Sequence, residues 1–146
     1  PEPTREHVAA LSCPELPGSP WVPARRLATS RIALLTSAAL HPRAQPPFAA
    51  GSPEFHELSS ALPSSDLIMS HISINFDRTG FQRDINVCYP VDRLRELADD
   101  GTIASVAPTN YSVMGSTDPL TMTATARVIA DRLRQEEVDA VLLCPV

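Results

Sequence analysis

The chain has 146 residues, of which 43% are hydrophobic and 20% are charged, and its formal net charge at pH 7 is −5. This composition supports one domain with a packed core and excludes a fibrous or wholly disordered chain. The acidic balance argues against a nucleic-acid partner, and no apolar run reaches the roughly 18 residues of a membrane-spanning helix, so we expect neither nucleic acid nor membrane as a partner.

Proline divides the chain, because 11 of its 15 Pro lie at or before Pro63. The spacing of four prolines between residues 14 and 23 excludes regular helix and central strand there, since proline lacks a backbone N–H. We therefore predict an extended arm over residues 1–30, pinned to the domain by Trp21, and an α/β domain over residues 31–146. The proline-rich connection 38–65 leaves room for little more than a turn at 54–58, and we interpret it as a functional loop or contact surface.

Four short apolar runs have the character of strands that are buried on both faces. They are residues 32–36, 66–70, 103–107 and 139–144. The segments before the last two runs have helical apolar spacing instead. In one of them Val91, Leu94 and Leu97 share a face and Gly101 ends the helix.

The second helix begins at Asp118-Pro119, a capping residue followed by proline in the first turn, and continues with apolar residues through Leu133. Strands that alternate with helices are typical of a parallel sheet with right-handed crossovers. We predict an α/β fold with a mostly parallel open sheet, Rossmann-like or flavodoxin-like. The domain is expected to be incomplete, because the chain stops at Val146 directly after the fourth apolar run.

Several common cofactor chemistries are not supported by the sequence. The five glycines have no G-x-G-x-x-G spacing, so we expect no NAD or FAD site. All 12 basic residues are Arg, which excludes a lysine Schiff base. His7, His41 and His56 have no metal-ligand spacing with any Cys, so we expect no metal. Three cysteines without a C-x-x-C pair or a signal peptide indicate free thiols in a reducing cytoplasm.

Ligands of open parallel sheets bind at the carboxyl ends of the strands, so we searched there for candidate site residues. His71 follows the second run and could act as a general acid/base or orient a carboxylate; the alternative is a structural histidine. Cys144 ends the fourth run, either as a thiol at the site or as a buried small hydrophobe. These two are the catalytic candidates.

The candidate substrate-binding residues lie at strand ends and in the polar stretch 72–89. Asp84 and Asn86 could bind a substrate amine or amide, or hold a turn through their own side chains. Arg83, together with Arg78, could clamp a carboxylate, or could belong to the solvated surface. The full set of candidates is Ser70, Arg83, Asp84, Asn86 and Asn110.

From about Trp21 to Val146, a series of short segments resembles the selenoprotein B family of glycine, sarcosine, betaine and D-proline reductases, in particular the short D-proline type. The resemblance depends on the order and spacing of the segments together. They are Trp21-Val22-Pro23, residues 32–38, Met69-Ser70-His71, Asp84-Ile85-Asn86, residues 89–97, residues 107–110, Met114-Gly115 and residues 138–143.

The resemblance implies an oxidoreductase subunit that reductively cleaves a C–N bond in a small amino acid or N-methylated derivative, of the D-proline, glycine, betaine or sarcosine type. The resemblance places the protein among oxidoreductases for which a disulfide is the electron acceptor when the reaction is written in reverse. It implies a selenocysteine directly after Val146, encoded by UGA, and no cofactor in the chain itself. His71, Asp84, Asn86 and Asn110 would line the pocket around that selenocysteine.

The resemblance also implies partners. A partner subunit with an N-terminal pyruvoyl group captures the substrate amine, the selenolate attacks the activated α-carbon, and a thiol system supplies electrons. The chain alone is then expected to be inactive. Two alternatives remain open: a racemase-like or flavodoxin-like α/β enzyme that uses Cys and His, and a non-catalytic interaction module that binds through its proline-rich segments.

Overall fold

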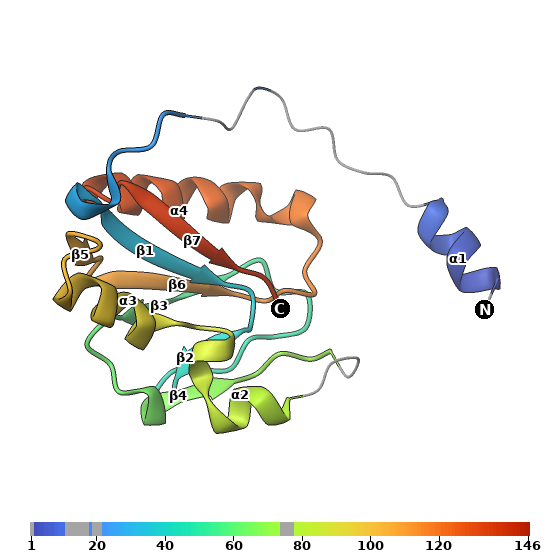
Figure 1. Cartoon of the computed structure of the whole chain (residues 1–146). Coiled ribbons are helices and arrows are strands. Elements are labelled where there is room, and N and C mark those ends of the chain that lie inside the picture. Colours follow the sequence, from blue (N-terminus) through green and yellow to red (C-terminus); the bar gives the residue numbers. More distant parts are fainter. Residues whose placement is uncertain (1, 11–17, 19–21, 74–77) are drawn as a thin grey trace.

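The computed structural model describes residues 2–10, 18, 22–73 and 78–146 (Figure 1). Its main sheet is built around β1 (Arg31–Thr36). The other strands of this sheet are β3 (Phe55–Ser59), β5 (Ser105–Val106), β6 (Thr109–Val113) and β7 (Ala140–Cys144). The predicted α/β fold with a mostly parallel sheet is confirmed, because β5, β6 and β7 all run parallel to β1.

The pairing along β1 explains the order of the strands. β7 pairs with β1 from Ile32 to Thr36, and so occupies one whole side of it. β5 and β6 share the other side, β5 at the start of β1 and β6 at its end. β3 pairs antiparallel with the outer side of β6. Within the described residues β7 pairs with β1 alone, which makes β7 an edge strand.

A second, two-stranded sheet lies next to the first. It pairs β2 (Leu40–Pro42) antiparallel with β4 (Leu67–Met69). The prediction that residues 66–70 form a strand of the parallel sheet is therefore wrong. β1 is followed by a sharp change of direction at Ala39, whose φ is +52°, and the chain that leaves there pairs with β4 instead. All three residues of β4 are half-buried rather than buried on both faces.

The two predicted crossover helices are present. α3 (Val91–Asp99) is followed by Gly101, whose φ of +78° is the left-handed conformation that ends many helices. A short 3-10 turn, η4 (Pro119–Met122), precedes α4 (Thr123–Gln135), and the Asp118 side chain accepts a hydrogen bond from the backbone N–H of Leu120.

The helices cover opposite faces of the main sheet, as the alternation of side chains along β1 requires. Leu34 packs in one cluster with Val91 and Leu94 of α3. Its neighbour Leu35 packs against the other cluster, which contains Ile129 of α4. Figure 1 shows α3 and α4 on the two sides of the β1–β7 ribbon.

Other elements differ from the sequence predictions. The arm contains a helix, α1 (Glu2–Ala9), because only its first turn contains a proline; Figure 1 shows it apart from the sheet. The turn predicted at 54–58 is strand β3. Trp21 lies outside the described residues. The remaining short elements are η1 (Leu27–Thr29), η2 (Ser64–Asp66), α2 (Thr79–Arg83) and η3 (Ile85–Val87). Among the described residues, no helix combines the length and apolar character needed to cross a bilayer.

Candidate functional site

Ser37 marks the carboxyl end of β1 and holds the chain that leaves β7. The backbone N–H of Ser37 donates to the carbonyl of Cys144 at 3.1 Å. Its hydroxyl oxygen accepts from the backbone N–H of Val146 at 2.8 Å and lies 3.4 Å from the Val146 carbonyl oxygen. Backbone and side chain of one serine thus fix residues 144–146 beside the end of the central strand.

His71 reaches the same place from the end of β4. It is 4% exposed, and its Nδ1 accepts a hydrogen bond from the backbone N–H of Ser73 at 3.1 Å. Because Nδ1 is the acceptor, the neutral imidazole carries its proton on Nε2. Burial lowers the pKa of His71 below its usual value of 6.5, and the positive charge of Arg78 lowers it further. The ring is therefore neutral at pH 7.

Gly115, just beyond β6, completes this corner. A Cβ atom on Gly115 would lie 2.8 Å from the carbonyl oxygen of Ser37 and 3.0 Å from Nε2 of His71. Only glycine allows the three segments to approach so closely. We call the cluster of Ser37, His71, Gly115 and Val146 the strand-end corner.

Arg78 stabilises the backbone around His71 by hydrogen bonds. Its guanidinium donates to the carbonyl oxygens of His71 at 2.5 Å and Ser73 at 2.7 Å. These bonds hold the turn that fixes the His71 ring. The arginine thus orients the imidazole and also contributes the charge that lowers its pKa.

The two described cysteines are protonated thiols at neutral pH. Cys88 is 1% exposed, and burial, followed by the nearby Cys144, raises its pKa to about 11. Burial also raises the pKa of Cys144, which is half-buried and packs with Val146 against the core. A reactive cysteine needs its pKa lowered, so this arrangement does not favour the alternative that uses Cys and His for proton transfer. Cys13 lies outside the described residues.

Asp84 and Asn86 hold each other and the start of α3. One carboxylate oxygen of Asp84 accepts from the backbone N–H and from the side-chain amide of Asn86, both at 2.9 Å. Asn86 in turn accepts from the backbone N–H of Asp92 at 3.1 Å. The bonds from Asn86 lower the pKa of Asp84. These are the contacts of the turn-holding alternative, and binding of a substrate by these side chains stays a prediction.

The side chains of Asn110 and Ser70 also make their hydrogen bonds to other groups of the fold. Asn110 is 0% exposed; its carbonyl oxygen accepts from the backbone N–H of Leu34 at 2.7 Å and its amide donates to the Tyr89 hydroxyl at 3.0 Å. The Ser70 hydroxyl donates to the carbonyl of Ala39 at 3.2 Å and accepts from a backbone N–H at 3.1 Å. In the structure both side chains stabilise the fold, and their proposed contact with substrate stays a prediction.

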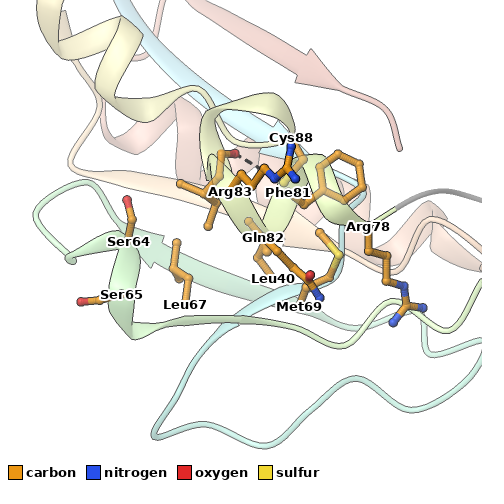
Figure 2. Close-up of a pocket in the computed structure, with 11 residues that line it drawn as sticks. Leu40, Ser64, Ser65, Leu67, Met69, Arg78, Phe81, Gln82, Arg83 and Cys88 are labelled. Atoms are coloured by element: carbon orange, nitrogen blue, oxygen red, sulfur yellow. Dashed lines mark hydrogen bonds between the residues drawn. The ribbon is translucent and has the colours of Figure 1, made fainter.

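A cavity of about 460 Å³ lies between the β2–β4 sheet and the α2–η3 segment (Figure 2). Of the candidate residues, Arg83 lines it. The other lining residues are Leu40, Ser64, Ser65, Leu67, Met69, Arg78, Phe81, Gln82, Ile85 and Cys88. No sequence pattern predicts this cavity, because its walls come from a hairpin and a short helix that periodicity does not reveal.

Sequence reasoning also missed Ser37 and Gly115 as parts of one site. Ser37 could have been found, because it directly follows a buried strand. The close approach at Gly115 could not, because it depends on three separate segments. Among the described residues, no group of three or more His, Cys, Asp or Glu is placed to hold a metal ion.

The model of the family described as glycine/sarcosine/betaine reductase selenoprotein B matches residues 11–146. The D-proline reductase subunit gamma of Acetoanaerobium sticklandii is 34% identical over 134 residues, which is 89% of this chain and 54% of that protein. The glycine reductase complex component B subunit gamma of Symbiobacterium thermophilum is 30% identical over 136 residues, which is 85% of this chain and 30% of that protein.

The chain therefore spans about half the length of the first of these relatives, and less of the second. No solved structure matches it. Both relatives are named as subunits of reductases. The match of the family model over most of the chain shows that this protein belongs to the glycine/sarcosine/betaine reductase selenoprotein B family.

Proposed function

We propose that the chain is part of the selenocysteine-containing subunit of a reductase complex that cleaves a C–N bond in a small amino acid or N-methylated derivative. The observation that carries the proposal is the family match over residues 11–146. Its relatives are a D-proline reductase subunit and a glycine reductase subunit, which supports substrates of that size and charge. Sarcosine and betaine are further candidates.

The strand-end corner is the proposed reaction site. The family resemblance assigns a selenocysteine to the position after Val146, and the Val146 N–H is held by the Ser37 hydroxyl at 2.8 Å. The close approach at Gly115 brings Nε2 of His71 next to the backbone of Ser37. A selenol ionises at lower pH than a thiol, and therefore supplies a nucleophile at pH 7 that the protonated Cys88 and Cys144 do not.

His71 is suited to donate a hydrogen bond at this site. Its Nδ1 is occupied by the Ser73 N–H, so the ring proton is on Nε2, which lies 3.0 Å from the position that a Cβ on Gly115 would take. A neutral imidazole donor can stabilise a developing negative charge without becoming a fixed cation. We assign His71 this hydrogen-bonding role, and Ser37 the role of positioning the backbone at Val146.

The partners follow from the same family. Because the relatives are subunits, we propose a partner subunit, with the pyruvoyl group that captures the substrate amine, and a thiol electron donor. Both thiol and selenol chemistry need a reducing compartment, which supports the cytoplasm as the location. On this proposal the 146-residue chain has no reductase activity by itself.

The experiment is to read the codon after Val146 and to measure the intact mass and selenium content of the native protein from selenium-supplied cells. We expect UGA at that codon and a longer protein with one selenium. A native protein that ends at Val146, or that contains no selenium, would overturn the proposal. As a functional control, the native complex is assayed with a dithiol donor for ring opening of D-proline and for amine release from glycine, sarcosine and betaine.

A further inference from the structure

We propose that the cavity between the β2–β4 sheet and the α2–η3 segment binds a small carboxylate with an apolar body, such as a branched aliphatic monocarboxylic acid. This inference does not depend on the proposed reductase function. It rests on the volume of the cavity, on the chemistry of its walls and on the arginines that line it, Arg83 above all.

The walls are suited to an apolar body. The volume of about 460 Å³ lies within the usual range for small-molecule sites. Leu67 and Met69 of β4 form one wall, and Phe81 of α2 stands across from them (Figure 2). Leu40 and Cys88 also line the cavity and are each 1% exposed, so this part of the wall belongs to the packed core and is preformed.

The charge at the cavity comes from arginine. Arg83 lines it, and none of the ion pairs found among the described residues involves Arg83. Arg78 also lines it, while its guanidinium donates to the His71 and Ser73 carbonyls. A guanidinium presents paired N–H donors that match a carboxylate. The side chains of Ser64 and Gln82 add neutral hydrogen-bonding groups.

The same walls select against amino acids. Among the residues that the structure describes, no Asp or Glu lines the cavity, so an ammonium group entering with the carboxylate would meet apolar side chains and two arginines. Taking an ammonium group out of water without a partner is costly. We therefore expect an apolar acid to bind in preference to the zwitterion with the same carbon skeleton, which separates this cavity from a site for amino-acid substrates.

The protein contains three methionines, and only one of them lines the cavity. Methyl-labelled methionine therefore gives three NMR signals, in which Met69 reports binding while Met114, buried in another cluster, and Met122 serve as internal controls. Titration with 4-methylpentanoate is expected to shift the Met69 signal with a Kd of about 1 mM. Leucine and 4-methylpentanamide should bind at least about tenfold more weakly.

The variant Arg83→Gln keeps a polar side chain but removes the charge, and should weaken the acid about tenfold or more. The matched control is Arg93→Gln on α3, where Arg93 is exposed and pairs with Glu96; it should leave the Kd unchanged. Unchanged Met114 and Met122 signals confirm that each variant is folded.

Three results would each overturn the proposal. One is a Met69 signal that does not move up to about 10 mM acid, a concentration well above the expected Kd. The second is leucine or the amide binding as tightly as the acid. The third is undiminished binding of the acid by the folded Arg83→Gln variant.

Discussion

Replacing Asn110 by alanine tests whether the hydrogen bonds of this side chain stabilise the main sheet. The amide of Asn110 satisfies the backbone N–H of Leu34 and donates to the Tyr89 hydroxyl, and all these groups are buried. Each buried polar group left without a partner costs about 1–3 kcal/mol, and the removed amide leaves a small cavity. We expect Asn110→Ala to lower the free energy of unfolding by about 4 kcal/mol, a large share of the roughly 5–15 kcal/mol typical of a folded domain.

The assay is urea unfolding followed by far-UV circular dichroism, with Tyr89→Phe and the double variant completing a cycle. Tyr89→Phe removes only the hydroxyl that accepts from Asn110, and should cost about 1 kcal/mol. The double variant should be more stable than the sum of the single effects by about 1 kcal/mol, because the two side chains share one bond. A cost below about 1 kcal/mol for Asn110→Ala, or strict additivity, would refute the structural role.

Three further predictions concern the strand-end corner and the thiols. Gly115→Ala should destabilise the fold by about 1–3 kcal/mol in the same assay, because its Cβ meets Ser37 and His71, whereas Gly80→Ala, with open space around it, should not destabilise; equal effects would contradict the close approach. The imidazole of His71 should titrate below pH 6.5 by NMR, and a midpoint above that value would show that its surroundings are not those described. Burial raises the folded pKa of Cys88 from about 9 to about 11, so stability should fall as the pH rises from 9 to 11, and Cys88→Ala should reduce that slope; an unchanged slope would exclude Cys88 as its source.

The parts of the fold that sequence patterns predicted are those with strong local signals. The central strand β1 and the edge strand β7 are runs of apolar residues, and α3 has both an apolar face and Gly101 at its end. For β1 and α3 the pattern along the chain and the burial in the fold agree. The run at 139–144 is also a strand, but the prediction that it is buried on both faces is wrong, because Leu142 and Leu143 of β7 are exposed. Local signals therefore sufficed for the α/β class and for the two crossover helices.

The parts that failed depend on partners distant in the sequence. Strand β6 lies beyond the predicted strand at 103–107 and was missed because two of its buried residues, Asn110 and Ser112, are polar. Asn110 is accommodated through its hydrogen bonds to Leu34 and Tyr89. The run at 66–70 is a strand, but its apolar residues do not reveal that it pairs with β2.

The candidate site shows the same limit. His71 could be singled out because it follows an apolar run, but its position against Gly115 depends on three segments meeting. The sequence left two roles open for Asp84 and Asn86, substrate binding and holding a turn. Their contacts in the structure hold the turn before α3. Residue type and spacing thus predict where to look, while the partners of each side chain decide what it does.

The edge strand β7 has a practical consequence for handling the protein. Within the described residues its outer backbone groups face no neighbouring strand, and Leu142 and Leu143 are 42% and 65% exposed beside them. An open apolar edge of this kind is a template for strand addition between molecules. Concentrated samples of this chain should therefore self-associate and precipitate along β7, and dilution or a second polypeptide that caps this edge should keep it dispersed.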